Sequence, residues 1–86
     1  MRAAVVKAWG SLEAGELPEP RPGPGEVLIA VKAAGVNFAD TLIVAGKYQE
    51  KPAFPFSPGL EVAGEVVALG PDVKTLKKGD RVMGTT

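Results

Sequence analysis

Apolar residues along the chain form short runs separated by glycine and proline, a pattern that is typical of strands joined by tight turns. The clearest run covers residues 26–34 and is closed by Gly35. Alternate apolar residues share one face at period two: Val27, Ile29, Val31 and Ala33. The residues between them are largely apolar too, so we expect this strand to be covered on both sides.

Further apolar runs predict four more strands. Residues 3–9 and 12–17 flank the turn signal Gly10-Ser11 and predict a hairpin. Residues 60–69 predict a second long strand, and another strand begins at residues 81–83. A glycine in the middle of the run at 60–69 (Gly64) indicates a bulge or a close approach of a neighbouring backbone.

One short helix is predicted to begin at Asn37, a residue that is favoured as an N-cap. Asp40 lies three residues further on and can accept from the cap, as in a capping box, although Glu or Gln is more usual there. Gly46 is expected to end the helix. Three apolar residues share one side of it: Phe38, Leu42 and Ala45.

Two segments are predicted to remain outside sheets because of their prolines. Residues 18–24 contain four prolines, which lack the N–H groups that a ladder needs, so we expect an extended surface connection. Residues 47–58 hold Tyr48, Phe54 and Phe56 among three prolines. Aromatic loops of this kind often line sites, although the two phenylalanines are better explained by packing within the loop.

These elements predict a mainly β fold with one short helix, arranged as a small barrel or a partly open sheet. The composition adds limits. Ten Lys and Arg balance ten Asp and Glu, and no apolar run has the length of a membrane span, so nucleic-acid and membrane partners are not expected. The start of the chain lacks a signal-peptide pattern, so we expect a soluble cytoplasmic protein.

The chain contains neither Cys nor His, so it offers no disulfide framework and no ligand of the kind that zinc prefers. Only carboxylates and carbonyls remain, and these suit hard ions such as magnesium or calcium. We therefore expect no zinc site within the chain.

Glycines, prolines and acidic residues recur in a characteristic order from Gly35 onward. The segments are Gly35-Val36-Asn37-Phe38-Ala39-Asp40, then Gly46-Lys47-Tyr48, then Pro58-Gly59-Leu60-Glu61-Val62-Ala63-Gly64-Glu65-Val66, and finally Gly79-Asp80-Arg81-Val82. In this order they resemble the medium-chain dehydrogenase/reductase superfamily, in its zinc-free quinone oxidoreductase branch. The opening hairpin also resembles that family, so the likeness covers nearly the whole chain.

Two departures from the zinc-dependent members of that superfamily bear on chemistry. Those alcohol dehydrogenases carry Cys-His-x-Asp where this chain has Asn37-Phe38-Ala39-Asp40, and Gly-His-Glu where it has Gly59-Leu60-Glu61. Both zinc ligands expected in this stretch are thus replaced, by Asn37 and Leu60. A catalytic zinc polarises an alcohol or carbonyl oxygen, so its loss favours reduction of an already activated acceptor.

The resemblance implies a GroES-like barrel followed by a Rossmann domain, with NADPH bound between them. It implies hydride transfer to a quinone or an α,β-unsaturated carbonyl without zinc, in what we expect to be a homo-oligomer. No glycine-rich dinucleotide fingerprint occurs in the chain. We therefore expect residues 1–86 to be the N-terminal part of the catalytic domain, inactive alone, with the final barrel strands and the Rossmann domain missing.

The same resemblance implies which residues face the acceptor. The Asn37 amide would lie at the mouth of the cleft and donate to the acceptor's carbonyl oxygen, while Tyr48 would supply a stacking ring and a hydroxyl. Asp40 is a weaker candidate because its role as the helix partner of Asn37 already explains it. Glu61 is interpreted as structural and as pairing with an arginine, for which Arg81 is a candidate.

Two other functions are compatible with the sequence. One is an enoyl-thioester reductase of the same superfamily, which the sequence does not separate from a quinone reductase. The other is a free-standing GroES-like module that acts by assembly, as a co-chaperonin does. Such a module needs a long mobile apolar loop, and the prolines of residues 47–58 argue against one.

Overall fold

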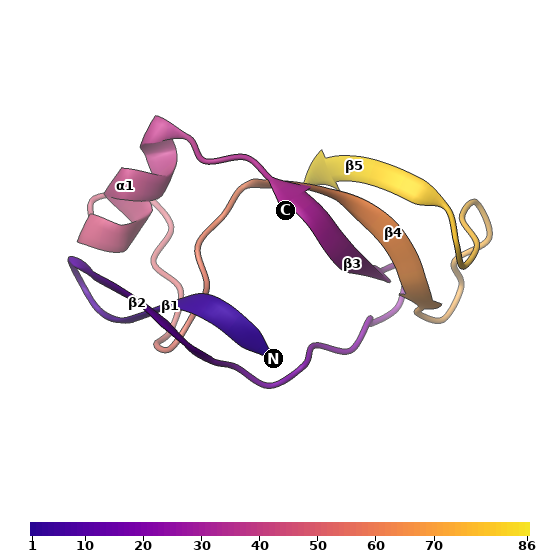
Figure 1. Ribbon diagram of the computed structural model, residues 1–86, viewed down its shortest axis with the longest axis horizontal. Helices are drawn as coiled ribbons and strands as arrows, with labels where there is room; N and C mark the ends of the chain where they lie inside the picture. The colour runs from indigo at the N-terminus through magenta and orange to yellow at the C-terminus, as the bar shows by residue number, and fades with distance from the viewer. The chain divides into compact units, whose positions relative to one another are not determined.

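A computed structural model describes all 86 residues and contains five strands and one helix. The elements are β1 (Arg2–Ala8), β2 (Ser11–Glu16), β3 (Val27–Ala34), α1 (Phe38–Ala45), β4 (Glu61–Leu69) and β5 (Arg81–Thr85) (Figure 1). The predicted fold class, mainly β with one short helix, is confirmed. The strands form two open sheets, one of two strands and one of three.

The chain divides into two compact units that interleave along the sequence. Unit 1 comprises residues 1–19 and 36–60, and unit 2 comprises residues 20–35 and 61–86. Each unit is described separately below. The single helix has only eight residues, and no helix of the chain is long and apolar enough to cross a membrane.

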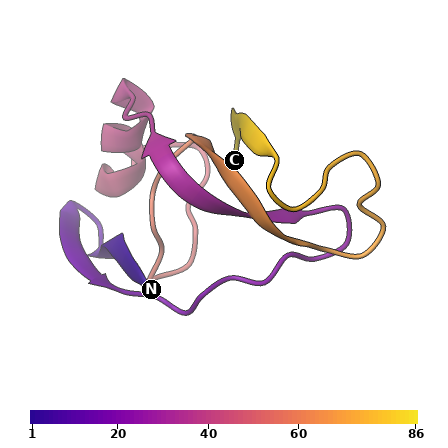
Figure 2. The same cartoon turned by 45° about the vertical axis from the view of Figure 1, so that its right-hand side comes forward.

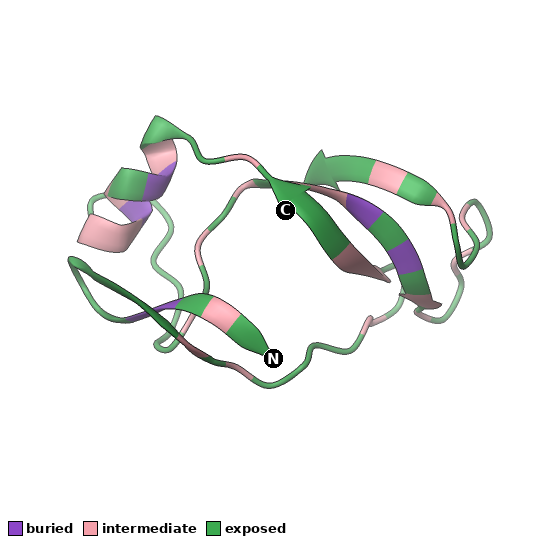
Figure 3. Cartoon of the chain, viewed as in Figure 1, coloured by how far each residue is buried: buried purple, intermediate pink, exposed green.

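Unit 1 is built on the predicted hairpin. β1 and β2 pair antiparallel, with Arg2 opposite Glu16 and Ala8 opposite Ser11, and Gly10 takes the positive φ of 82° that the turn requires. Val5 and Val6 of β1 are fully buried, and Ile43 of α1 is nearly so (purple in Figure 3). These three side chains form the apolar core of the unit.

The helix α1 turns a different face inward from the one that the apolar pattern indicated. Ile43 and Asp40 are buried, whereas Phe38 at the first helical position is 79% exposed. The expected face of Phe38, Leu42 and Ala45 is therefore not the buried one. In a helix of only two turns, the caps at its ends determine its orientation as much as its apolar side chains do.

An aromatic cluster fixes the loop that follows α1. The rings of Trp9 and Phe54 meet edge to face with centroids 4.7 Å apart, and Phe56 lies 6.0 Å from Trp9. The backbone of Phe56 also exchanges two hydrogen bonds with Val6, at 2.8 and 3.2 Å. The prediction that Phe54 and Phe56 pack within the loop is confirmed, with Trp9 as a partner that the sequence did not indicate.

Unit 2 is a three-stranded antiparallel sheet in which β4 lies between β3 and β5 (Figures 1 and 2). On β4 the residues at even positions face inward, with Gly64 and Val66 buried, while Glu61, Glu65 and Val67 are exposed. The expectation that β3 is covered on both sides is wrong. Its second half, from Val31 to Ala34, is exposed.

Two glycines let backbones approach closely within this sheet. A Cβ on Gly64 would collide with the carbonyl oxygen of Ala30 on β3, which confirms the predicted close approach. A Cβ on Gly70 would collide with the carbonyl oxygen of Gly23, and the N–H of Gly70 donates to Glu26 at 2.8 Å. The end of the proline-rich connection is thereby fastened to the turn that follows β4.

Candidate functional site

Asn37 and Asp40 lie together at the start of α1. Asn37 is the N-cap, with an extended backbone at φ −119° and ψ 162°, and its side chain is exposed. Its N–H donates to Oδ2 of Asp40 at 2.8 Å, and the N–H of Asp40 donates to the Asn37 carbonyl at 3.0 Å. The carboxylate thus fixes the backbone that carries the exposed amide.

The second carboxylate oxygen of Asp40 has no partner. The residue is 8% exposed, and Oδ1 is buried without a hydrogen bond. A buried acceptor that is left unsatisfied destabilises a fold by about 1–3 kcal/mol, so such an atom is unusual in a native structure. Asp40 therefore does more than cap the helix, because its Oδ1 remains able to accept a further hydrogen bond close to Asn37.

Tyr48 lies beyond the other end of the helix. An eight-residue helix is about 12 Å long, so its two ends place Asn37 and Tyr48 far apart along the axis. The Tyr48 side chain is half-buried. The structure thus brings together two of the three predicted site residues, Asn37 and Asp40, and places the third at the opposite end of α1.

The C-terminal end of α1 is held as firmly as its start. Gly46 adopts φ 73°, its N–H donates to Ile43, and the N–H of Lys47 donates to Leu42 at 2.9 Å. The ring of Trp9 covers Gly46 so closely that a Cβ there would lie 2.7 Å from the indole. Tyr48 therefore leaves the helix in a fixed direction, although its ring makes no contact with the aromatic cluster.

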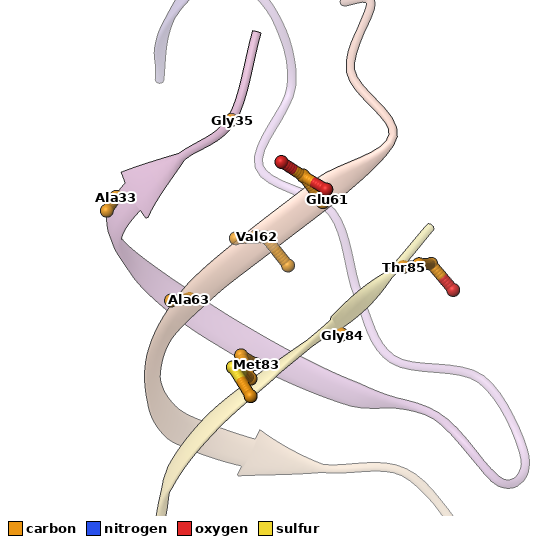
Figure 4. Close-up of a pocket in the computed structure, with 8 residues that line it drawn as sticks. All are labelled: Ala33, Gly35, Glu61, Val62, Ala63, Met83, Gly84 and Thr85. Carbon is orange, nitrogen blue, oxygen red and sulfur yellow. The ribbon is translucent and has the colours of Figure 1, made fainter. Parts of the chain in front are cut away.

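A hollow in unit 2 was not foreseen from the sequence. It has a volume of about 480 Å³ and lies where the ends of β3, β4 and β5 meet (Figure 4). Its lining residues are Ala33, Gly35, Glu61, Val62, Ala63, Met83, Gly84 and Thr85. Most of the lining is apolar, and the Glu61 carboxylate is its single charge. The run of small residues at 33–35 was the signal that could have indicated it.

The Glu61 carboxylate lies against Gly35, where any Cβ would collide with it. The expectation that Glu61 pairs with Arg81 is wrong. In the antiparallel register Glu61 lies opposite Thr85, and Arg81 lies opposite Glu65, four residues further along β4. Neither Glu61 nor Arg81 takes part in an ion pair.

The residues present do not fit zinc. Asn37 and Leu60 occupy the two positions at which the zinc-dependent members of the superfamily carry ligands, and no three acidic or other metal-binding side chains come together anywhere in residues 1–86. They do not fit the phosphates of a dinucleotide either. Anions are favoured at free helix N-termini, and the N-terminus of α1 is already occupied by the Asp40 carboxylate.

A close ion pair lies in the turn before β5. Lys77 Nζ lies 2.9 Å from Asp80 Oδ1, and the backbone N–H of Lys77 donates to Oδ2 at 3.0 Å. The side-chain hydrogen bond raises the pKa of Lys77 above its usual value and lowers the pKa of Asp80. These two groups do not line the hollow.

Comparison with known proteins shows which family the chain is similar to. Residues 23–86 match the alcohol dehydrogenase GroES-like domain. Over 68 residues the chain is 56% identical to quinone oxidoreductase-like protein 2 of Rattus norvegicus. The matched stretch covers 78% of this chain but only 19% of the rat protein.

Two solved structures agree closely with the whole fold. A mycobacterial protein in complex with NADPH is 40% identical with a TM-score of 0.89, over 100% of this chain and 28% of its own. A cobalt- and zinc-bound thermostable alcohol dehydrogenase from Pyrobaculum aerophilum is 48% identical with a TM-score of 0.88, over 96% of this chain and 26% of its own. The chain thus spans 19–28% of the length of these relatives.

Proposed function

The chain belongs to the alcohol dehydrogenase GroES-like domain family of the medium-chain dehydrogenase/reductase superfamily, and on that premise we propose that it forms the N-terminal catalytic part of a zinc-independent, NADPH-dependent oxidoreductase. The reaction is hydride transfer to a quinone or an α,β-unsaturated carbonyl. The similarity to a quinone oxidoreductase-like protein supports an oxidoreductase, and one similar structure contains NADPH.

One observation carries the proposal: an exposed amide, Asn37, lies on a fixed backbone at the position where the zinc-dependent members of the superfamily carry a metal ligand. The nicotinamide supplies the hydride, and the protein contributes binding, orientation and hydrogen bonds. The Asn37 amide donates to the acceptor's carbonyl oxygen as negative charge develops there. Such a donor acts on the transition state without a metal.

Asp40 and Tyr48 take secondary roles in this proposal. Asp40 fixes the Asn37 backbone through Oδ2, and its buried Oδ1 accepts from a donor that arrives with the rest of the site. Tyr48, at the far end of α1, contacts the remote part of a planar acceptor through its ring. The phosphates of NADPH bind elsewhere in the longer protein, since residues 1–86 offer no site for them.

Steady-state kinetics of the longer enzyme, with a panel of quinones, enones and enoyl thioesters, test the proposal. We expect Asn37→Ala to lower kcat/KM for the acceptor by about 10²- to 10³-fold with little change in NADPH affinity. A quinone or enone should be turned over best. Preference for enoyl thioesters would keep the enzyme class and replace the substrate.

Two matched variants complete this experiment. Tyr48→Phe keeps the ring, so a small effect would indicate stacking rather than a hydrogen bond. Asp40→Ala should lower thermal stability and, because Asp40 fixes the Asn37 backbone, should lower kcat/KM for the acceptor by less than Asn37→Ala does. Unchanged acceptor kinetics would show that Asp40 acts only as the helix partner of Asn37. If Asn37→Ala unfolds the protein while activity per folded molecule stays intact, Asn37 is a helix cap only and the site assignment fails.

The metal content of the purified enzyme is an independent test. Asn37 and Leu60 replace the implied ligands, so we expect activity to survive dialysis against a chelator and zinc to be substoichiometric. A similar structure from Pyrobaculum aerophilum holds cobalt and zinc, so the metal content distinguishes the zinc-free branch of the family from its zinc-dependent members. Stoichiometric zinc that activity requires would contradict the proposal.

A further inference from the structure

One indole ring lies at both ends of the loop that carries Tyr48. At the start of this loop (residues 47–53), the Trp9 ring covers Gly46 so closely that a Cβ there would lie 2.7 Å from it. At the end of the loop, the same ring meets Phe54 edge to face, with centroids 4.7 Å apart. The segment between Gly46 and Phe54 could span about 27 Å when extended, so contact of both ends with one ring closes the loop tightly.

Backbone hydrogen bonds from β1 and its turn hold the same two ends. The N–H of Gly10 donates to the carbonyl oxygen of Val44, in the last turn of α1, at 2.7 Å. Val6 exchanges two hydrogen bonds with Phe56, and the Phe56 ring stacks on Phe54 with centroids 6.1 Å apart. All of these contacts are made within unit 1, so they do not depend on what the rest of a longer protein covers.

Tyr48 is the residue of the loop that this closure fixes most closely. It follows the end of the helix at Gly46 by two positions, and it alone in loop 47–53 is half-buried, whereas the other residues of the loop are exposed. Added chain can only increase this burial, so the residues of the chain itself hold the ring in place. The Tyr48 hydroxyl makes no hydrogen bond within residues 1–86.

We propose that Trp9 is a positioning residue for the acceptor site and acts through Tyr48. The inference rests on the proposed function, in which the Tyr48 ring contacts the remote part of a planar acceptor. The indole has no ring contact with Tyr48, so its effect passes through the backbone of the loop. By holding both ends, Trp9 limits the positions that Tyr48 takes before the acceptor binds. A contact that is ordered in advance loses less conformational entropy on binding.

The position of Tyr48 makes this effect depend on the size of the acceptor. Asn37 and Tyr48 lie at opposite ends of α1, which is about 12 Å long. An acceptor whose carbonyl meets Asn37 contacts Tyr48 only if it extends well beyond the reacting group. A fused-ring quinone has that extension, and a four-carbon enone does not. Trp9 therefore contributes to the discrimination between extended and small acceptors.

Steady-state kinetics of the longer enzyme, with 1,4-naphthoquinone and methyl vinyl ketone as acceptors, test the proposal. We expect Tyr48→Ala to raise KM for the quinone about tenfold and Trp9→Leu to raise it about fivefold, with kcat changed by less than about twofold. A contact with the remote part of a substrate is equally strong in the ground state and the transition state, so its loss changes KM alone. KM for the small enone and for NADPH should stay unchanged.

A double-mutant cycle separates positioning from general damage. If Trp9 acts through Tyr48, Trp9→Leu should cause no further rise in the KM of the Tyr48→Ala enzyme. Trp9→Phe keeps a ring over Gly46 and should restore a KM close to that of the unaltered enzyme. Val5→Ala is the control, because it removes part of the fully buried core of β1 and leaves both ends of the loop in contact with Trp9. It should lower thermal stability and leave KM unchanged.

Gly46→Ala is a second way to disturb the closure, because its Cβ would displace the indole from the start of the loop. It should give the same rise in KM for the quinone, and it replaces Trp9→Leu if that variant does not fold. Folded variants with an unaltered KM would remove the role of Trp9 and leave the proposed function in place. Additive effects in the cycle, or an equal rise for both acceptors, would also overturn the proposal. If Tyr48→Ala itself leaves KM unchanged, the assignment of Tyr48 in the proposed function is wrong, and the role of Trp9 fails with it.

Discussion

The two compact units contain nearly equal numbers of residues but are stabilised in different ways. Unit 1 holds all five aromatic residues of the chain and fixes its helix by a cap at each end. Unit 2 has no aromatic residue and depends on a three-stranded ladder in which glycine lets two backbones meet. The residues proposed to contact the electron acceptor lie in unit 1, whose structure depends on local turn and cap residues. The hollow lies in unit 2, whose structure depends on the register between strands.

The largest expected effect comes from breaking the close approach in unit 2. Gly64→Val would drive a side chain into the carbonyl of Ala30 and should destabilise the chain by about 3 kcal/mol, because a backbone atom cannot move aside. Urea denaturation followed by circular dichroism measures the loss. Gly84→Ala is the control, since its Cβ meets no atom within 4 Å and should change stability little. Equal effects of the two would remove the special role of Gly64.

A pair of glycines in unit 1 separates backbone conformation from aromatic packing. Gly10 and Gly46 have similar φ values, 82° and 73°, but only Gly46 lies under the Trp9 ring. We expect Gly10→Ala to destabilise by about 1 kcal/mol and Gly46→Ala by about 2 kcal/mol. The same denaturation experiment gives both values. If the two substitutions have the same effect, Trp9 contributes nothing to the end of the helix.

The N-terminal cap of α1 has a smaller net effect, because Asp40→Ala has two opposing consequences. It removes the 2.8 Å hydrogen bond to Asn37, and it also removes the buried oxygen that has no partner. We expect a net loss of about 1 kcal/mol, measured as a lower urea midpoint. Asp40→Asn keeps one acceptor for the Asn37 N–H and should lose less. An increase in stability for Asp40→Ala would show that the unpaired oxygen outweighs the cap.

The smallest effect is expected from the Lys77–Asp80 turn of unit 2, and it depends on pH. The folded pKa of Asp80 is lowered, so its contribution is present above the unfolded value of 3.8 and is lost as pH falls through the folded pKa. The folded pKa of Lys77 is raised, so its contribution is lost as pH rises above 10.5. The difference in urea midpoint between the chain and Asp80→Asn should therefore be constant near neutral pH and shrink in acid. A constant difference at all pH values would exclude the ion pair as its cause.

Local signals in the sequence predicted most of the elements. The turn at Gly10, the cap at Asn37, the helix end at Gly46 and the close approach at Gly64 were all foreseen, because each depends on a residue type with a narrow conformational preference. Strand ends differ from the predictions by only one or two residues, except that β5 extends to Thr85.

Long-range features were missed for a common physical reason. Whether Glu61 meets Arg81 depends on the register of β5 against β4, and the sequence of neither strand fixes that register. The contact of Trp9 with residues 54–56 joins positions that are far apart along the chain. The hollow around Glu61 arises where three strand ends meet, so its lining cannot be read from any one of them.

The uneven distribution of aromatic residues also determines what can be observed by optical spectroscopy. The one tryptophan, the one tyrosine and all three phenylalanines belong to unit 1, so emission and near-ultraviolet signals are blind to unit 2. A fluorescence-monitored melt would follow only unit 1, and a collapse of the three-stranded sheet would give no signal in fluorescence or in the near ultraviolet. A tryptophan introduced at the half-exposed position Val67 on β4 would give unit 2 a chromophore of its own.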